Sequence, residues 1–153
     1  VVILDNVRSM HNVGASFRTA DAFLIEAIYL TGITAKPPHR EINKTALGAT
    51  ETVEWLYFST TYEAVMHAKD KGYKIAAIEQ ADQSVFLHEF IPEENTPYAF
   101  VFGNEVFGVE DEVVEQSDIC IEIPQFGTKH SLNISVSVGV VLWDIISKLQ
   151  LEK

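Results

Sequence analysis

The sequence predicts an α/β domain in which helices flank a mostly parallel sheet. Two observations indicate this fold class: short apolar runs alternate with segments of helical periodicity, and polar loops directly follow two of those runs. At 153 residues, 47% of them hydrophobic, the chain is the size of one compact domain, and we expect a single domain over residues 1–153. The expected strands are residues 1–4, 27–30, 53–58, 74–78, 98–102 and 119–123.

Two of the expected helices have recognisable ends or faces. Over residues 61–71, Thr60 and Glu63 form a capping box at the start, and Gly72 supplies the C-terminal stop. Another helix follows the first strand, and we expect Asn12 to cap it. The apolar positions of this helix recur at helical spacing at Val13, Phe17, Ala20 and Leu24.

Two other segments are harder to interpret. Residues 34–44, which contain Pro37 and Pro38 followed by His39 and Arg40, are expected to form an exposed loop that is either a plain connector or an RNA contact. Residues 134–140 alternate with period two, as in a strand, whereas the apolar residues of 139–149 form one broad helical face. The local pattern alone favours a strand for the first part of this C-terminal segment.

Charge is distributed unevenly along the chain. The formal charge of −11 and the pI near 4.7 argue against a nucleic-acid partner, because phosphate contacts need Lys and Arg. The net charge is +1 over residues 1–50, −13 over 51–123 and +1 over 124–153, which weakens that argument for both ends of the chain. We expect part of the central acid to be a solvated helix face rather than a catalytic cluster; its residues are Glu110, Asp111, Glu112 and Glu115.

Composition limits the other classes of site. The single Cys120 excludes an intrachain disulfide and favours a reducing, cytoplasmic setting. No apolar run reaches the roughly 20 residues of a membrane span, and we expect no membrane association. The sequence begins with Val1 rather than Met, so it does not bear on a targeting signal. No metal is expected, because no metal-ligand spacing occurs among His11, His39, His67, His88 and His130.

The polar loops that follow two apolar runs are the strongest sign of function. α/β proteins place their chemistry at the carboxyl ends of strands, where such loops begin. One loop opens with Pro124 and Gly127, which fix its path, and then places four hydrogen-bonding groups before the next element, at Lys129, His130, Ser131 and Asn133. The other loop comprises residues 103–108. We expect the two loops to form one composite site.

Three motifs in a fixed order resemble those of the SpoU-type, or TrmH-like, RNA 2′-O-ribose methyltransferases, a branch of the SPOUT superfamily. The likeness spans nearly the whole chain, and the last motif is the most distinctive of the three. The motifs are Asn12-x-Gly14-x-x-x-Arg18-x-Ala20, Phe102-Gly103-Asn104-Glu105-x-x-Gly108 and Ile123-Pro124-x-x-Gly127-x-x-x-Ser131-Leu132-Asn133.

The resemblance implies a fold and a cofactor. Members of the family have an α/β sheet whose C-terminal part forms a deep trefoil knot, and the knot binds S-adenosylmethionine. A helix follows the last motif in the family, so we expect residues 133–151 to be helical. The implied cofactor-binding positions are Ile78, Glu79, Phe102, Gly103, Ile123, Gln125 and Leu132.

The resemblance also implies an activity. The chain is expected to transfer a methyl group to a ribose hydroxyl of RNA, with transfer RNA favoured over ribosomal RNA, and to form a homodimer through an apolar surface that includes Val141, Ile145 and Leu149. The polar catalytic positions implied are Asn12, Arg18, Glu105, Ser131 and Asn133. Each of these five has an alternative role as a helix cap or as a hydrogen bond that fixes a loop.

Two other functions fit parts of the sequence. A SPOUT-type homologue that binds RNA or cofactor without methylating would suit the acidic charge, although all five polar positions are present. An ordinary Rossmann-like nucleotide-binding enzyme is disfavoured, because no Gly-x-Gly-x-x-Gly follows the first strand.

Overall fold

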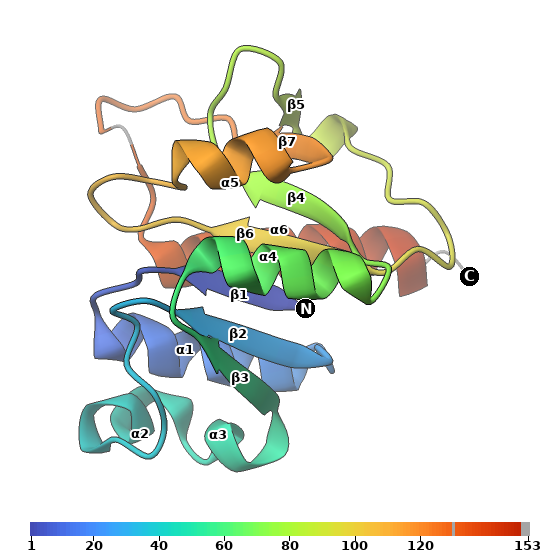
Figure 1. Ribbon diagram of the computed structural model, residues 1–153. Coiled ribbons are helices and arrows are strands. Elements are labelled where there is room, and N and C mark those ends of the chain that lie inside the picture. The colour runs from blue at the N-terminus through green and yellow to red at the C-terminus, as the bar shows by residue number, and fades with distance from the viewer. Residues whose placement is uncertain (130, 151–153) are drawn as a thin grey trace.

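The computed structural model describes residues 1–129 and 131–150 as one seven-stranded sheet with helices on both faces (Figure 1). His130 and Leu151, on which two of the sequence predictions fall, lie outside the described residues. Every pair of neighbouring strands is parallel, which confirms the predicted fold class. The strands are β1 (Val2–Asp5), β2 (Ala27–Thr31), β3 (Glu54–Phe58), β4 (Lys74–Ile78), β5 (Val85–Phe86), β6 (Tyr98–Phe102) and β7 (Ile119–Glu122).

The strand order β3-β2-β1-β6-β4-β7-β5 aligns the carboxyl ends of the central strands. Leu4 of β1 and Ile78 of β4 both pair with Phe102 of β6, and Ile78 also pairs with Ile121 of β7. The loops that leave these strands therefore begin at the same edge of the sheet. The two-residue strand β5 was not predicted, because so short a run has no period to detect.

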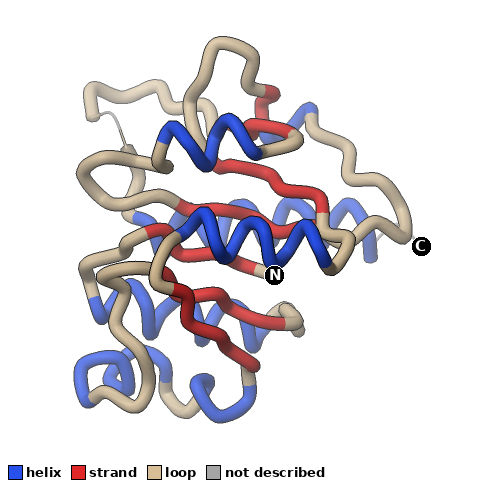
Figure 2. The backbone as a smooth tube through the Cα atoms, viewed as in Figure 1, coloured by secondary structure: helices blue, strands red, loops and turns tan. Residues whose placement is uncertain are grey.

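The helices divide between the two faces of the sheet (Figure 2). One face is covered by α4 (Thr61–Asp70) and α5 (Asp111–Gln116). The opposite face is covered by α1 (Met10–Ala22) and α6 (Ile134–Gln150), with α2 (Arg40–Ala46) and α3 (Ala49–Thr52) beyond α1 and the short 3₁₀ turn η1 (Leu87–Glu89) beside α6. Successive side chains of β1 pack against opposite helix layers, because Val2 and Leu4 face α1 while Ile3 faces α4.

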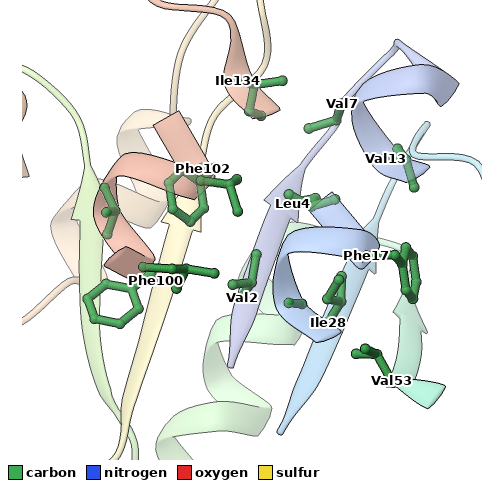
Figure 3. Close-up of a cluster of buried hydrophobic side chains, with 14 of the residues drawn as sticks. Val2, Leu4, Val7, Val13, Phe17, Ile28, Val53, Phe100, Phe102 and Ile134 are labelled. Atoms are coloured by element: carbon green, nitrogen blue, oxygen red, sulfur yellow. The ribbon is translucent and has the colours of Figure 1, made fainter. Parts of the chain in front are cut away.

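The larger core lies between the sheet and the helices α1 and α6 (Figure 3). Phe17 of α1 packs near Val2, Leu4 and Ile28, and all four side chains are fully buried. Ile134, the first residue of α6, joins the same core beside the end of β6. Burial at the N-terminus of α6 fixes the end of the polar loop that precedes it.

The described ends of α4 agree with the prediction, and those of α1 do not. Thr60 Oγ1 accepts a hydrogen bond from the Glu63 amide at 3.1 Å, and Gly72 follows with φ +88°. The N-cap of α1 is Ser9, whose Oγ accepts from the Asn12 amide at 3.2 Å, so Asn12 is not the cap. Leu24 lies beyond the end of α1 and is 92% exposed, so it is not part of the apolar face.

The segment 34–44 is not one exposed loop. Thr34 is buried, and its Oγ1 accepts a hydrogen bond from the Val7 amide at 2.9 Å. The helix α2 begins at Arg40 after His39, whose Nδ1 accepts from the Glu41 amide at 3.1 Å, and Ile42 is fully buried against α1. The two adjacent prolines concealed this helix start, since histidine is an uncommon N-cap.

The C-terminal segment is helical from Ile134 to Gln150, as the resemblance implied except that Asn133 precedes the helix, and the strand that the local pattern favoured does not form. Val138, Val141, Leu142 and Ile145 of α6 are buried against their own sheet. Val141 and Ile145 are therefore unavailable for contact with a second copy, contrary to expectation. None of the described helices is both long and apolar enough to cross a membrane.

Candidate functional site

A cavity of about 300 Å³ lies at the carboxyl ends of β4, β6 and β7, beside the start of α6. All seven positions that were expected to bind cofactor line this cavity, namely Ile78, Glu79, Phe102, Gly103, Ile123, Gln125 and Leu132. Of the five expected catalytic positions, Glu105 and Ser131 also lie on its wall, whereas Asn12, Arg18 and Asn133 do not.

Two glycines make the close packing under this cavity possible. A Cβ on Gly103 would lie 2.2 Å from the carbonyl carbon of Gly108 and 2.3 Å from the amide nitrogen of Val109. Gly108 has φ +71°, and a Cβ there would lie 2.3 Å from Glu79 Oε2. Gly103 has no room for a side chain, so the turn from 103 to 108 folds directly against the end of β6, and the positive φ of Gly108 favours glycine.

The carboxylate of Glu79 fixes backbone rather than pointing freely into the cavity. Its Oε1 accepts from the Gln80 amide and its Oε2 from the Val109 amide, both at 2.9 Å. These bonds join the end of β4 to the turn that follows β6. Glu79 thus shapes the wall of the cavity while both carboxylate oxygens have donors.

Glu105 joins the second motif to the first. Its two carboxylate oxygens accept from the amides of Arg8 and Ser9, each at 3.1 Å, at the residues that immediately precede α1. A carboxylate at this position also interacts favourably with the positive end of the α1 dipole. The structure therefore gives Glu105 the loop-fixing role that the sequence left open, at the wall of the cavity.

The start of α6 is fixed by Asn133. Its Oδ1 accepts from the amide of Ser135 at 2.9 Å and from the hydroxyl of the same residue at 2.6 Å. Asn133 is thus a helix cap, which was the alternative to its catalytic role. Because it directly follows Ser131 and Leu132, this cap also fixes the position of those two residues at the cavity.

Asn12 and Arg18 both lie on α1, outside the cavity. Asn12 is half-buried in the first turn of the helix, and Arg18 is exposed almost two turns later. Neither side chain has a hydrogen bond among the described residues. The structure thus separates the first motif's polar side chains from the cavity, although Glu105 holds the beginning of α1 close to it.

The chain resembles known proteins over most of its length. The sequence profile of the SpoU rRNA Methylase family matches residues 1–143. The chain belongs to this family. It is 33% identical to the 23S rRNA (guanosine-2′-O-)-methyltransferase of Neisseria meningitidis serogroup B, over 93% of this chain and 56% of that relative. It is 32% identical to the tRNA (guanosine(18)-2′-O)-methyltransferase of Aquifex aeolicus, over 94% of this chain and 67% of that relative.

Solved structures of SpoU family members have the same fold. The AdoMet-bound rRNA methyltransferase from Sinorhizobium meliloti superposes with a TM-score of 0.89 at 28% identity, covering 97% of this chain and 56% of that one. The TrmH/SpoU tRNA modifying enzyme of A. aeolicus gives 0.84 at 30% identity, covering 97% and 74%. This SpoU chain therefore spans little more than half the length of several relatives that it matches.

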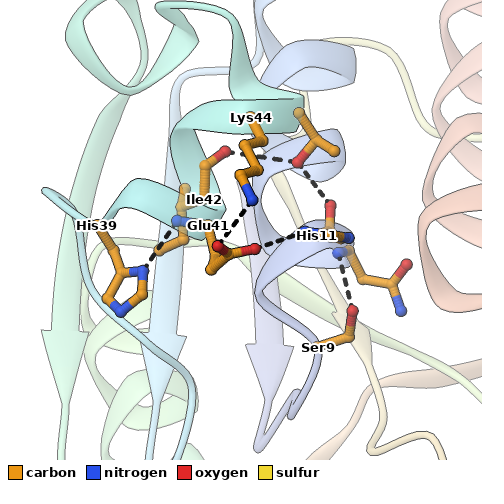
Figure 4. Close-up of polar contacts among 8 residues, drawn as sticks. Ser9, His11, His39, Glu41, Ile42 and Lys44 are labelled. Carbon is orange, nitrogen blue, oxygen red and sulfur yellow. Dashed lines mark hydrogen bonds and ion pairs between the residues drawn. The ribbon is translucent and has the colours of Figure 1, made fainter.

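Beyond the cavity, this SpoU family member has a polar cluster between α1 and α2 (Figure 4). Glu41 accepts from Lys44 and pairs with His11 Nε2, both at 2.9 Å, and these contacts lower the pKa of the Glu41 carboxyl. Thr45 Oγ1 donates to the His11 carbonyl at 2.8 Å. The cluster fastens the segment 34–44 to α1, so this segment is held firmly against the helix. An RNA contact there stays a prediction.

Several cavity residues were not predicted. Asn104 and Gly108 belong to the quoted second motif, and their place in that motif beside the predicted Gly103 and Glu105 was the available signal. Glu122 lines the cavity from the end of β7 and accepts from Ser84 Oγ at 2.8 Å, a contact with the unpredicted β5 region. Among the described residues, no group of three His, Cys, Asp or Glu could hold a metal ion.

Proposed function

We propose that this chain is an RNA 2′-O-ribose methyltransferase, which transfers a methyl group from S-adenosylmethionine to a ribose hydroxyl of transfer or ribosomal RNA. The observation that supports this most is the convergence of all seven expected cofactor positions on one cavity at the carboxyl edge of the sheet. The relatives' names describe guanosine 2′-O-methyltransferases, and one related structure is AdoMet bound.

The cavity fits the proposed cofactor chemically. Apolar side chains of Ile78, Phe102, Ile123 and Leu132 line it and suit the flat faces of adenine. The missing side chain of Gly103 lets the turn 103–108 pack at the end of β6, so its backbone groups lie at the cavity wall, where they can read the donors and acceptors at an adenine edge. When bound there, the cofactor would supply the activated methyl group, and no metal is needed for its transfer.

The residues of the chain would contribute positioning and charge stabilisation. Correct orientation of a hydroxyl nucleophile supplies roughly 7 to 11 kcal/mol of barrier reduction in well-oriented systems. A guanidinium is a poor base, and we assign Arg18 to the phosphate next to the target ribose and to the developing alkoxide. Asn12 and Ser131 would orient the ribose, while Glu105 and Asn133 hold the two loops in place.

The separation of Arg18 from the cavity supports a homodimer in which Arg18 of a second copy completes the site. The helix α6 offers an exposed apolar face for this contact. Trp143 is 54% exposed and packs on Phe23 with ring centroids 6.2 Å apart, and Val136 and Val140 are exposed on the same helix. These residues replace Val141 and Ile145 in the proposed interface.

Two further features belong to this proposal. The first is the deep trefoil knot, which is supported by the return of the chain from β7 to α6 and by the contact of α6 with β6 and α1. The second is a cytoplasmic location, which follows from the proposed RNA substrates. Limited proteolysis within residues 123–129, with the fragments then tested for separation in denaturant, would report on the knot.

Calorimetry and methyl transfer test the proposed activity together. The purified chain should bind S-adenosylmethionine and S-adenosylhomocysteine but not NAD, and it should transfer labelled methyl groups from the former to total RNA. Binding without transfer would instead support the non-catalytic homologue. Absence of binding by folded, ligand-free protein would overturn the cofactor assignment.

Sedimentation tests the dimer separately. The wild-type chain should sediment at twice its mass of 17.1 kDa. Trp143→Glu should shift it to a monomer, because the charge would be desolvated in an apolar contact. Ile91→Glu is the matched control, since Ile91 is 82% exposed in the segment between η1 and β6. A wild-type monomer at micromolar concentration would contradict the proposal.

A further inference from the structure

A second cavity, of about 410 Å³, adjoins the first one. The two cavities share Asn104 and Gly108, so only the turn after β6 separates them. The second cavity is bounded on its other sides by Asn6 and Arg8, which follow β1, and by Ile33, which follows β2. A molecule in this cavity would reach the edge of the cofactor cavity at the shared turn.

An exposed aromatic ring is fixed at this cavity. Phe107 is 84% exposed, although burying such a side chain would be favourable. The turn that presents it is well braced: Asn104 Oδ1 accepts from the Phe107 amide at 3.1 Å, and Asn104 and Gly108 exchange backbone hydrogen bonds of 3.0 and 2.9 Å. Ile33, which is 60% exposed, adds a second apolar surface to the same cavity.

The polar wall of the cavity contains the carboxylates of Asp5 and Glu110 and the cation Arg8, and hydrogen bonds orient its acidic side. Asn6 Oδ1 accepts from the Ile33 amide at 3.1 Å, which directs its Nδ2 to Asp5 Oδ1 at 2.9 Å and to Glu110 Oε1 at 3.1 Å. Asp5 is fully buried and its carboxylate also accepts from Thr61 Oγ1 and from the Glu110 amide. Among the described residues, Glu110 Oε2 has no donor, and it remains available as an acceptor.

We propose that this second cavity binds the base of the nucleotide that is methylated, with the ring of Phe107 stacking on the base and the Glu110 carboxylate accepting hydrogen bonds from a guanine edge. This inference rests on the proposed methyltransferase function and adds the residues that would select the substrate.

The chemistry of the wall favours a base over the other parts of a nucleotide. The carboxylates of Asp5 and Glu110 repel phosphate, so a phosphate would remain outside, near the exposed Arg8. An unstacked base is commonly held on an aromatic ring and read along its Watson–Crick edge. Guanine presents two adjacent donors on that edge, N1–H and the 2-amino group, which match a carboxylate acceptor.

Phe107→Ala tests the stacking contact. Base stacking on aromatic side chains contributes about 1–3 kcal/mol, so kcat/KM for methyl transfer to RNA should fall by roughly 10-fold to 100-fold. S-adenosylhomocysteine affinity measured by calorimetry should stay within about twofold, because the ring does not line the cofactor cavity. Ile91→Ala, which also removes an exposed apolar side chain, should match the wild type.

Glu110→Gln tests the reading of the base edge. Labelled total RNA digested to nucleosides should yield 2′-O-methylguanosine with the wild type. A transcript containing inosine in place of guanosine lacks the 2-amino donors, and the wild type should methylate it about tenfold less well. This discrimination should largely disappear in Glu110→Gln. Burial and the neighbouring charges of Asp5 and Glu112 raise the pKa of Glu110, so the neutral variant should fold normally.

The outcomes separate this inference from the proposed function. If the wild type transfers methyl groups but kcat/KM is unchanged in Phe107→Ala, the base cavity is overturned and the methyltransferase function stands. The same conclusion follows if the wild type methylates a nucleoside other than guanosine. Loss of cofactor affinity in Phe107→Ala would assign the ring to the cofactor cavity instead. A wild-type chain that neither binds S-adenosylhomocysteine nor transfers methyl would overturn the proposed function itself.

Discussion

The two regions that contain the predicted site residues differ in how complete they are within one chain. The region from 78 to 134 brings nine predicted residues to one cavity, seven of them at expected cofactor positions. The start of α1 contributes Asn12 and Arg18, and neither reaches that cavity. The proposed cofactor cavity is therefore formed within a single chain, whereas our proposal completes the transfer site with RNA and Arg18 of a second copy.

The difference follows from the connections between the regions. The cavity loops leave adjacent strands in register and are fastened by the carboxylate of Glu79 and by close glycine contacts. The first motif continues into a helix whose buried face is directed to the sheet, so Arg18 on the opposite face points to solvent. Glu105, through the amides of Arg8 and Ser9, links the two regions directly at the start of α1.

The largest expected effect is that of replacing Arg18, which should slow methyl transfer without changing the cofactor site. Arg18→Ala should lower single-turnover methyl transfer to RNA by roughly 100-fold to 1,000-fold, because removal of one group that stabilises developing charge has this effect in other enzymes. Cofactor affinity should be nearly unchanged. Arg18→Lys should rescue poorly, because an ammonium lacks the planar bidentate fork.

Single-turnover transfer of labelled methyl and cofactor titration of the same variants would measure this separation. Wild-type transfer by Arg18→Ala would make Arg18 a merely structural residue. Lost cofactor binding in Arg18→Ala would instead show that the two regions form one site.

The next effect concerns the cavity region. Gly103→Ala should lower the free energy of unfolding by about 2 kcal/mol and weaken S-adenosylhomocysteine binding, because the three nearest atoms that its Cβ would meet all belong to the backbone. Chemical denaturation and calorimetry would measure the two changes. Gly139→Ala is the control: its Cβ meets nothing within 4 Å, and it should stabilise α6 by about 0.5–1 kcal/mol. Equal stability of the two variants would contradict the close packing.

The smallest effect concerns the link between the regions. Glu105→Gln replaces one acceptor oxygen by an amide NH2 group that faces a backbone donor, so the free energy of unfolding should fall by about 1–2 kcal/mol. Glu115→Gln, on the exposed face of α5, should leave stability within about 0.5 kcal/mol of wild type. Urea denaturation would measure both variants. If Glu105→Gln is as stable as Glu115→Gln, Glu105 does not couple the two regions.

Much of the fold could be predicted from local sequence. Six of the seven described strands follow from apolar runs. The central strands β1, β2 and β6 are buried along their whole length and therefore need apolar residues on both faces. Thr60, Glu63 and Gly72 marked both ends of α4 through hydrogen bonds and backbone conformation that span only a few residues. The solvated acidic face around α5 was likewise predicted, since Asp111, Glu112 and Glu115 are all exposed.

Other features depended on contacts between residues far apart in the chain. Ser9 rather than Asn12 caps α1, and the amide of that cap is held by Glu105, 96 residues away. The buried Thr34 accepts from Val7, which no pattern within 34–44 could indicate. The three motifs identified the candidate site residues. That nine of these residues line one cavity depends on the strand order of the sheet, which places the ends of β4, β6 and β7 side by side.

The sequence by itself determined the fold class, the alternation of strands and helices, and the residues to which the family resemblance points, because periodicity, capping and motif order are properties of neighbouring residues. The tertiary structure decided which apolar side of α6 is buried and which polar residues share a cavity. Val141 and Ile145 pack on the sheet while Trp143 stays exposed. That choice depends on the direction in which α6 crosses β6, and a helix that is apolar on most sides is compatible with several such directions.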